Sequence, residues 1–152
     1  MKSLSTYALL AAMAVVTVSC KKDDENKPAP TKTELLTAKG WRLTDVKIGG
    51  QSIYSLFITD ACEKDNFIKF NSNKSATFDE GATKCSSSDP QTETGRWEFT
   101  TNETKLKLTD PYGDVQEGEI ATLNSTTLVF RDPNFDTGTG TNITAELTFT
   151  AQ

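Results

Sequence analysis

The chain has 152 residues, of which 16 are lysine or arginine and 21 are aspartate or glutamate, and its formal net charge is −5. This acidic balance favours solubility and argues against partners such as nucleic acid, which basic patches bind. Histidine is absent from the sequence, which excludes Ser-His-Asp and Cys-His nucleophilic catalysis and every histidine-ligated zinc or copper site.

Residues 1–26 are typical of a targeting signal. Lys2 precedes an apolar run over residues 7–18, whose length of about twelve suits a signal peptide and falls short of the roughly 20 residues that span a membrane. The run ends at Thr17-Val18-Ser19-Cys20, directly before the charged segment 21–26. This arrangement resembles a bacterial lipoprotein signal, in which a small residue precedes the cysteine that is lipidated.

The resemblance implies a signal peptide over residues 1–19 and a lipid anchor, palmitate included, on Cys20. The acidic run after Cys20 is similar to the surface-export signal of certain Gram-negative lipoproteins. We therefore expect the chain to be anchored in the outer membrane and exposed on the cell surface. An ordinary secretory signal with an unmodified cysteine is the alternative, and a periplasmic orientation stays open.

Residues 20–30 are charged and contain Pro28 and Pro30, which is typical of a disordered tether. A short helix is predicted over residues 31–39. Thr31 and Glu34 have the spacing of a capping box, and Gly40 stands where a helix would end.

From Trp41 onward the apolar residues recur at every second position, which predicts short β-strands. A bulge is expected at Asp45, where the alternation slips. The remaining runs cover residues 67–70, 76–78, 97–99, 106–108, 120–123, 128–130 and 147–149. Eight such strands, with no helix long enough for a parallel crossover, predict an all-β antiparallel barrel or sandwich.

The connections between these strands alternate in length. Those at 49–66, 79–93, 110–115 and 133–143 are long, and those at 72–74, 101–104 and 124–126 are short. In an up-and-down barrel the long ones would gather at one rim, with the helix as a floor at the other end. Cys62 and Cys85 would then lie at the same rim, and an even pair in an exported chain predicts a disulfide. A free catalytic thiol is the alternative, although it lacks a histidine base.

The pattern over residues 31–152 resembles a lipocalin-like domain of small bacterial lipoproteins. The residues that carry the resemblance are Gly40-Trp41 after the helix and Gly95-Arg96-Trp97-Glu98-Phe99 in mid-chain. It implies one domain, a small up-and-down eight-stranded barrel with a short N-terminal helix.

The barrel interior and the loop rim are the candidate binding sites. The residues expected to point inward are bulky: Trp41, Leu43, Phe70, Phe78, Trp97, Phe99, Leu108, Phe130, Leu147 and Phe149. They either fill the core or leave an apolar pocket for one small ligand. At the rim and mouth, the candidate ligand-binding residues are Tyr54, Phe57, Tyr112 and Phe135. The apolar residues near Tyr54 are expected to fold over the mouth as a lid.

The acidic loops are weaker candidates. Asp132, Asn134 and Asp136 have the spacing that opens a calcium loop, but Gly138 falls one position late and Ile143 replaces the bidentate glutamate. A solvated loop without metal is the favoured interpretation.

Four loop carboxylates could in principle act as the acid and base of a glycosidase: Asp60, Glu63, Asp110 and Asp114. Their spacing in the sequence does not identify any two of them as a catalytic pair. We expect no enzyme and no cofactor.

The sequence thus predicts a surface-anchored, non-catalytic lipoprotein that binds a small hydrophobic ligand in the barrel, or a glycan or envelope protein at the loop rim. The alternative is an accessory subunit of an envelope complex with a filled barrel. An enclosed apolar cavity of about 300 Å³ or more would favour ligand carriage.

Overall fold

The structure, a computed structural model, describes residues 28–138 and 140–152. The predicted signal peptide, Cys20 and most of the tether fall outside the described residues and stay predictions. Within the described ranges, no helix has the length and apolar character needed to cross a membrane.

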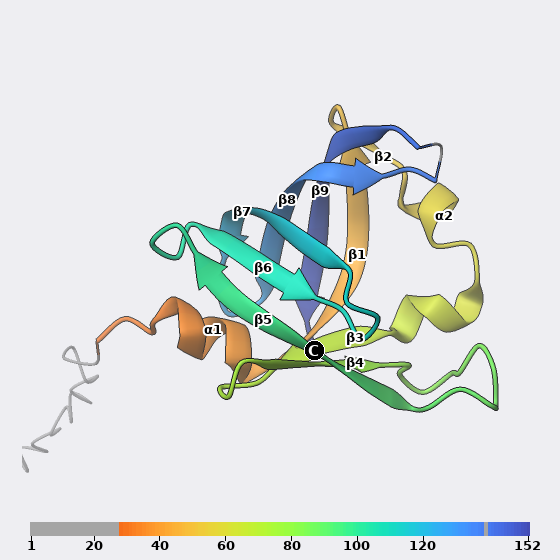
Figure 1. Cartoon of the computed structure of the whole chain (residues 1–152), viewed down its shortest axis with the longest axis horizontal. Coiled ribbons are helices and arrows are strands. Elements are labelled where there is room, and N and C mark those ends of the chain that lie inside the picture. The colour runs from red at the N-terminus through yellow and green to blue at the C-terminus, as the bar shows by residue number, and fades with distance from the viewer. Residues whose placement is uncertain (1–27, 139) are drawn as a thin grey trace, which may run out of the picture.

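The described part of the chain has a short helix near its start and continues mainly as strands (Figure 1). The helices are α1 (Lys32–Ala38), α2 (Tyr54–Phe57) and the 3₁₀ helix η1 (Ala61–Asp65). The strands are β1 (Gly40–Ile48), β2 (Gln51–Ser52), β3 (Phe67–Phe70), β4 (Ser75–Asp79), β5 (Thr92–Thr100), β6 (Lys105–Thr109), β7 (Val115–Leu123), β8 (Thr127–Asp136) and β9 (Asn142–Ala151). Every run predicted from the alternation falls within one of these strands.

Eight of the strands form a closed antiparallel barrel. Consecutive strands from β3 to β9 pair with one another, β1 pairs with β3, and β9 returns to pair with β1. The predicted up-and-down topology is confirmed. The additional strand β2 was not predicted, because two residues are too few to show alternation. It pairs with the end of β1 through the turn Gly49-Gly50, whose positive φ angles of 56° and 82° suit glycine.

Register shifts bend three of the barrel strands. The shift between Leu43 and Asp45 in β1 confirms the bulge expected at Asp45. Comparable shifts lie between Ile120 and Thr122 in β7 and between Asp132 and Phe135 in β8. Bulges increase the local twist of a strand, and this added curvature helps a sheet to close into a barrel.

Two long connections are shorter than predicted. Strand β5 already begins at Thr92, so the second connection covers residues 80–91. Strand β8 continues to Asp136 and β9 begins at Asn142, so the last connection covers residues 137–141 rather than 133–143. The expected connection began at residue 133, but Pro133 lies in the irregular part of β8, where proline is tolerated because no ladder donor is required.

The helix α1 closes the barrel at the end of the short turns. The predicted capping box is present: the backbone N–H of Glu34 donates to Thr31 Oγ1 (3.2 Å), and that of Thr31 donates to Glu34 Oε2 (2.7 Å). Leu36 is fully buried, and Lys32 Nζ donates to the carbonyl oxygen of Glu103 in the turn between β5 and β6. The helix is therefore the predicted floor of the barrel.

The tightly packed part of the core lies next to α1. Trp97 meets the ring of Phe70 edge-on, with centroids 5.8 Å apart, and its Nε1 donates to the carbonyl oxygen of Asn71 (2.9 Å). Trp41 Nε1 donates to the carbonyl oxygen of Leu36 (2.8 Å). Both buried indoles thus keep a hydrogen-bond partner, which buried tryptophan requires.

Burial decreases from the floor toward the long loops. In β3, β4 and β6, the inward residue nearer the short turn is fully buried, whereas the next inward residue is only partly buried. The buried members are Phe70, Ala76 and Leu106, and the partly buried members are Ile68, Phe78 and Leu108. The barrel is therefore solid at the floor and less densely filled toward the mouth.

Two inward glycines allow neighbouring strands to approach closely. A Cβ atom at Gly95 would lie 2.2 Å from the carbonyl oxygen of Thr109, and one at Gly118 would lie 2.2 Å from that of Arg131. Side chains cannot occupy such positions, because the obstructing atoms belong to the backbone of a paired strand. The mid-chain motif that begins at Gly95 therefore has a structural reason for its glycine.

Candidate ligand-binding site

The long connections gather at the end of the barrel opposite α1 (Figure 1). They comprise residues 49–66, 80–91, 110–114 and 137–141. The short turns at 71–74, 101–104 and 124–126 lie at the floor. This confirms the predicted separation of a loop rim from a closed floor, and it makes the rim the place where the interior meets solvent.

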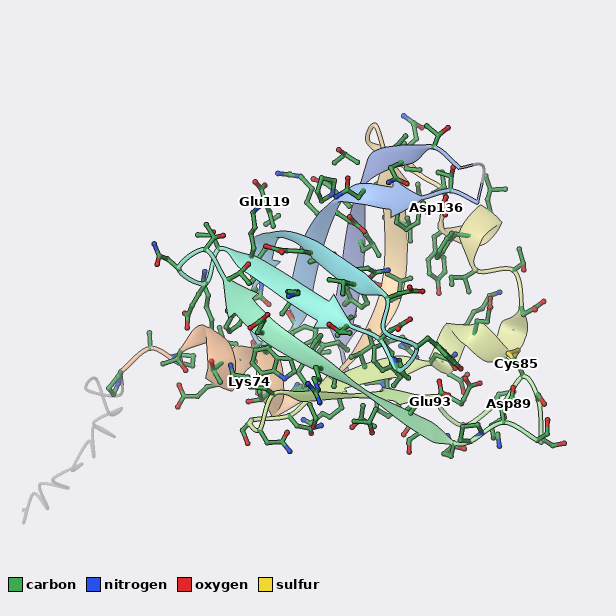
Figure 2. The ribbon with its side chains drawn as sticks, in the orientation of Figure 1. Lys74, Cys85, Asp89, Glu93, Glu119 and Asp136 are labelled. Atoms are coloured by element: carbon green, nitrogen blue, oxygen red, sulfur yellow. A yellow bond between two sulfur atoms is a disulfide. The ribbon has the colours of Figure 1, made fainter. Side chains whose placement is uncertain are left out.

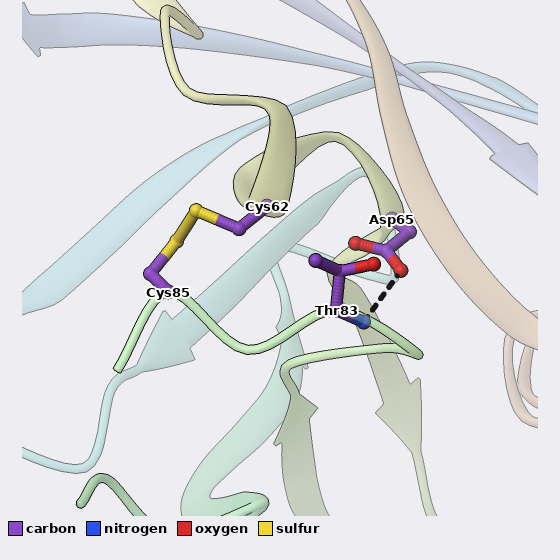
Figure 3. Close-up of a disulfide and its surroundings, with 4 residues drawn as sticks. All are labelled: Cys62, Asp65, Thr83 and Cys85. Atoms are coloured by element: carbon purple, nitrogen blue, oxygen red, sulfur yellow. Dashed lines mark hydrogen bonds between the residues drawn. A yellow bond between two sulfur atoms is a disulfide. The ribbon is translucent and has the colours of Figure 1, made fainter. Parts of the chain in front are cut away.

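A disulfide fixes two of the rim segments to each other. Cys62, on η1, is bonded to Cys85, in the 80–91 connection, with their Cα atoms 5.2 Å apart. Asp65 Oδ2 accepts the backbone N–H groups of Ala82 and Thr83, each at 2.9 Å. Figure 3 shows the disulfide and the bond to Thr83 side by side. The predicted disulfide is confirmed, whereas the role of Asp65 was not predicted.

An apolar cavity of about 190 Å³ lies inside the barrel. Its apolar walls come from β3, β4, β6, β8 and β9, and its polar walls lie on the mouth side. The apolar lining residues are Ile68, Phe70, Phe78, Leu106, Leu108, Leu128, Phe130, Leu147 and Phe149. The polar ones are Asp110, Asp114 and Gln116. The barrel interior therefore contains a space with an apolar bottom and a polar opening, and its volume is below the roughly 300 Å³ that would favour ligand carriage.

A second cavity, of about 400 Å³, lies at the mouth. It shares four lining residues with the inner cavity, namely Ile68, Phe78, Asp110 and Phe149, so the two spaces adjoin. On its outer side it is bordered by Ile58, Glu63, Glu93 and Tyr112 among others. Together the two cavities run from the loop rim into the barrel.

The four predicted rim residues have different positions. Tyr112 borders the mouth cavity and is 80% exposed, whereas Tyr54, Phe57 and Phe135 border neither cavity. Phe135 is buried on β8 and contacts the ring of Phe57, with centroids 5.1 Å apart. The Tyr54 hydroxyl donates to the carbonyl oxygen of Leu43 (3.3 Å). These three residues therefore attach α2 to the barrel.

The expected lid is only partly formed. Ile53 and Tyr54 pack against the core, and Ile58 borders the mouth cavity. Leu56 and Phe57 remain 78% and 44% exposed. The apolar segment thus lies beside the mouth with two of its side chains still in solvent.

Glu93 is a site residue that the alternation did not predict. It lies on the inward face of β5 two residues before Gly95, and both of its carboxylate oxygens accept the Tyr112 hydroxyl, at 3.0 and 3.1 Å. The pKa of the Tyr112 phenol is raised, chiefly because this hydrogen bond and the negative charge of Glu93 favour the protonated form. The sequence signal was the spacing Glu93, Gly95, Trp97, which has the two-residue period of one strand face.

The calcium-like spacing lies on a strand instead of a loop. Asp132 is buried on β8, with Oδ1 accepting the backbone N–H of Asn134 (2.8 Å), while Asn134 and Asp136 are exposed. Within residues 28–138 and 140–152, no group of three or more cysteine, aspartate or glutamate residues could hold a metal ion.

The four carboxylates considered for catalysis are divided among different places. Glu63 and Asp110 border the mouth cavity, Asp110 and Asp114 border the inner cavity, and Asp60 borders neither.

One protein family matches this chain. A family model described as a lipocalin-like domain matches residues 37–130, which is more than half of the 152 residues. The match runs from the end of α1 into β8 and so covers most of the barrel. No curated protein matches the chain.

Proposed function

The chain belongs to the family of lipocalin-like domains, and on that premise we propose that it is a non-catalytic protein that binds a small apolar molecule in its barrel. The observation that carries the proposal is the apolar inner cavity, which adjoins the mouth cavity and faces the open end of the barrel.

The volumes indicate how such a molecule is held. A cavity of about 150 Å³ accommodates benzene, so the inner space of 190 Å³ fits one ring or a short alkyl chain. Ligand pockets usually measure about 300 to 1,000 Å³, a range that the mouth cavity of 400 Å³ reaches and the inner cavity does not. We infer that the apolar part of the ligand occupies the inner cavity and that the rest of it lies at the mouth.

Binding of n-alkanols of increasing length tests this arrangement. Each buried methylene contributes about 0.8 kcal/mol, or roughly fourfold in affinity. Isothermal titration calorimetry from butanol upward should show that increment until the inner cavity is full, and a plateau afterwards. Affinity that rises without a plateau would indicate adsorption to the surface instead.

A matched pair of variants places the binding site. Leu108→Phe adds bulk inside the inner cavity and should weaken binding of the longer alkanols at least fivefold. Leu56→Phe is the same substitution at a residue that is 78% exposed and borders neither cavity, and it should leave binding unchanged. Equal affinities for the two variants would contradict binding inside the barrel.

We further propose that Cys20 anchors the protein by lipid to the outer membrane, with the mouth facing away from it. The support is the leader sequence together with the position of α1, the first described helix, at the floor end. Cys20→Ala in cells should move the protein from the membrane to the soluble fraction. Continued retention in the membrane would overturn the lipid anchor, and inaccessibility of the rim to added protease would overturn surface exposure.

A second candidate function is an accessory subunit that docks through its rim. It is favoured by the exposure of Leu56 and Phe57 on α2, because adjacent exposed apolar side chains commonly mark contacts. Cross-linking in cells distinguishes the two functions. A partner lost on Leu56→Ser, together with no alkanol binding, would favour the accessory role.

A further inference from the structure

We propose that the barrel takes a hydrophobic cation, a molecule with an ammonium group at the mouth and a short alkyl or aromatic tail in the inner cavity. The inference rests on the proposed binding function and adds the charge of the ligand to it. The cavities themselves are the site, and the charged residues around them select what enters.

Of the aspartate, glutamate, lysine and arginine residues that the structure describes, only aspartates and glutamates border the two cavities. They are Glu63, Asp79, Glu80, Glu93, Asp110 and Asp114, and neither a lysine nor an arginine lines either space. The apolar walls of the inner cavity begin directly below them, at Phe78, Leu108 and Phe149. A ligand in this site therefore has its tail among apolar side chains and its head among carboxylates.

The carboxylates at the mouth take part in none of the ion pairs found among the described residues. The acidic members of the ion pairs in the described part of the chain are Asp45, Glu98, Glu119 and Glu146, none of which borders the inner cavity or the mouth cavity.

The hydrogen-bond donors at the mouth are neutral groups. Asp79 Oδ1 accepts from the backbone of Gly81 and the side chain of Gln91, and Asp110 Oδ1 accepts from the backbones of Tyr112 and Asp114. These bonds orient the carboxylates without cancelling their negative charge.

The raised pKa of Tyr112 also indicates a negative electrostatic potential at the mouth. The pKa of Tyr112 is raised by its hydrogen bond to Glu93 and by the negative charges of Glu93, Asp89 and Asp110. Figure 2 shows Asp89 and Glu93 on the side of the molecule where the loops lie. Of these groups, Glu93, Asp110 and Tyr112 border the mouth cavity.

Electrostatics then discriminates between ligands that have tails of equal length but head groups of different charge. Clefts lined by one sign of charge with low-dielectric walls concentrate the field and attract the opposite ion. A fatty-acid carboxylate would bring a negative charge among the acids, whereas an ammonium would be attracted to them. The ring of Tyr112 borders the same space and offers a cation a π face.

Three probes of equal tail length test the inference: octylammonium, 1-octanol and octanoate, each titrated calorimetrically into the purified full chain at pH 7.5 and low salt. We expect octylammonium to bind at least tenfold more tightly than 1-octanol, and octanoate to bind most weakly. Octanoate binding as tightly as octylammonium would overturn the cation inference and leave the proposed apolar site standing. Failure of all three probes to bind would overturn both.

Two glutamates on the same strand provide the matched variants. Glu93→Gln removes a charge from the inward face of β5 and should weaken octylammonium about fivefold, with 1-octanol unchanged. Glu98→Gln removes the same charge from the exposed face and should change neither affinity. Equal losses in the two variants would mean that only the overall charge matters, which would refute selection at the mouth. Circular dichroism checks that both variants are folded.

Discussion

At the scale of single residues, the hydrogen bond between Tyr112 and Glu93 attaches the connection between β6 and β7 to strand β5. Tyr112 lies in the connection between β6 and β7, and Glu93 lies on β5, the strand that pairs with β6, so the hydrogen bond extends the contact between these neighbouring strands to the mouth. Because Tyr112 is largely exposed, the pair serves chiefly to position the two side chains at the cavity.

The ionisation of Tyr112 gives the first prediction. Because the pKa of Tyr112 is raised in the folded protein, the pair contributes fully to stability at pH values below the ordinary tyrosine pKa near 10. This contribution is lost as the pH rises through the raised pKa. Glu93→Gln should lower the pKa of Tyr112 toward 10. An ultraviolet titration of tyrosinate, with Tyr112→Phe subtracted, measures the change. An unaltered titration in Glu93→Gln would show that the bond is absent in solution.

The second prediction concerns Gly95. In Gly95→Ala the new Cβ would lie 2.2 Å from the carbonyl oxygen of Thr109 and 2.9 Å from the ring of Phe78, so strands β5 and β6 would have to separate. We expect a loss of about 3 kcal/mol in the free energy of unfolding, measured by urea denaturation. Gly40→Ala is the control, because its Cβ meets only the side chains of Phe67 and Gln152. A similarly small loss of unfolding free energy in both variants would contradict a clash between the new Cβ at position 95 and the backbone of Thr109.

At the scale of elements, the connection between β1 and β3 is folded rather than loose. Ser52 Oγ donates to Asp45 Oδ1 (2.6 Å) at its start, which lowers the pKa of the Asp45 carboxyl. In its middle, Phe57 packs on Phe135. At its end, η1 is attached to the 80–91 connection by the disulfide. The rim beside the mouth is thereby held in a defined shape.

Removal of the disulfide is the third prediction. The two cysteines are 23 residues apart in sequence, and a loop of that size corresponds to about 3 kcal/mol in the chain-entropy model. The double variant Cys62→Ser with Cys85→Ser should lose about that much stability. Limited proteolysis should cleave residues 80–91 faster while the barrel strands stay protected. Cleavage spread evenly over the barrel would show that the bond supports the whole fold.

Sequence alternation identified the barrel strands but not the full length of β5, β7, β8 and β9. It works where inward residues are apolar, as at Trp97 and Phe99, because burial imposes the two-residue period. At the mouth the inward positions are Glu93 in β5 and Gln116 in β7, which are polar because they border the opening. The alternation stops there, so the sequence predicted these strands from residues 97 and 120 although they begin at Thr92 and Val115.

The rim contacts were less predictable than the strands. The cysteine count and the alternating loop lengths indicated the disulfide correctly. The contact between Phe57 and Phe135 depends on how α2 folds back onto β8, and no local period encodes such a contact. For this reason three aromatic residues that the sequence assigned to the site belong to its supporting structure.

At the scale of the whole molecule, the barrel is solid at one end and hollow at the other. The floor is formed by α1 and the buried residues around Trp97, and the mouth by the acidic residues and loops. A small barrel that is packed at one end and hollow at the other keeps a stable core and still has space for a ligand. The same division separates the attachment proposed for Cys20 from the proposed binding site.

The fourth prediction follows from this division. Native-state hydrogen exchange should protect the backbone amides of β4 to β6 most strongly near the floor, at residues such as Ala76 and Leu106, because opening there exposes the packed core. Amides near the mouth, such as those of Asp79 and Thr109, should exchange faster and slow down when octylammonium is added. Uniform exchange along these strands would contradict a gradient of local stability.

The pairing of β1 with β9 makes closure of the barrel depend on the emergence of β9. Trp41 on β1 lies opposite Ala151 on β9, and the register continues to Ile48 opposite Ala145. Until the final ten-residue strand has emerged, β1 and β8 are open edges with unpaired backbone groups, which are prone to mispairing. During synthesis the sheet therefore stays unclosed until β9 has emerged from the ribosome. Truncation before residue 142 would convert this barrel into an aggregation-prone fragment.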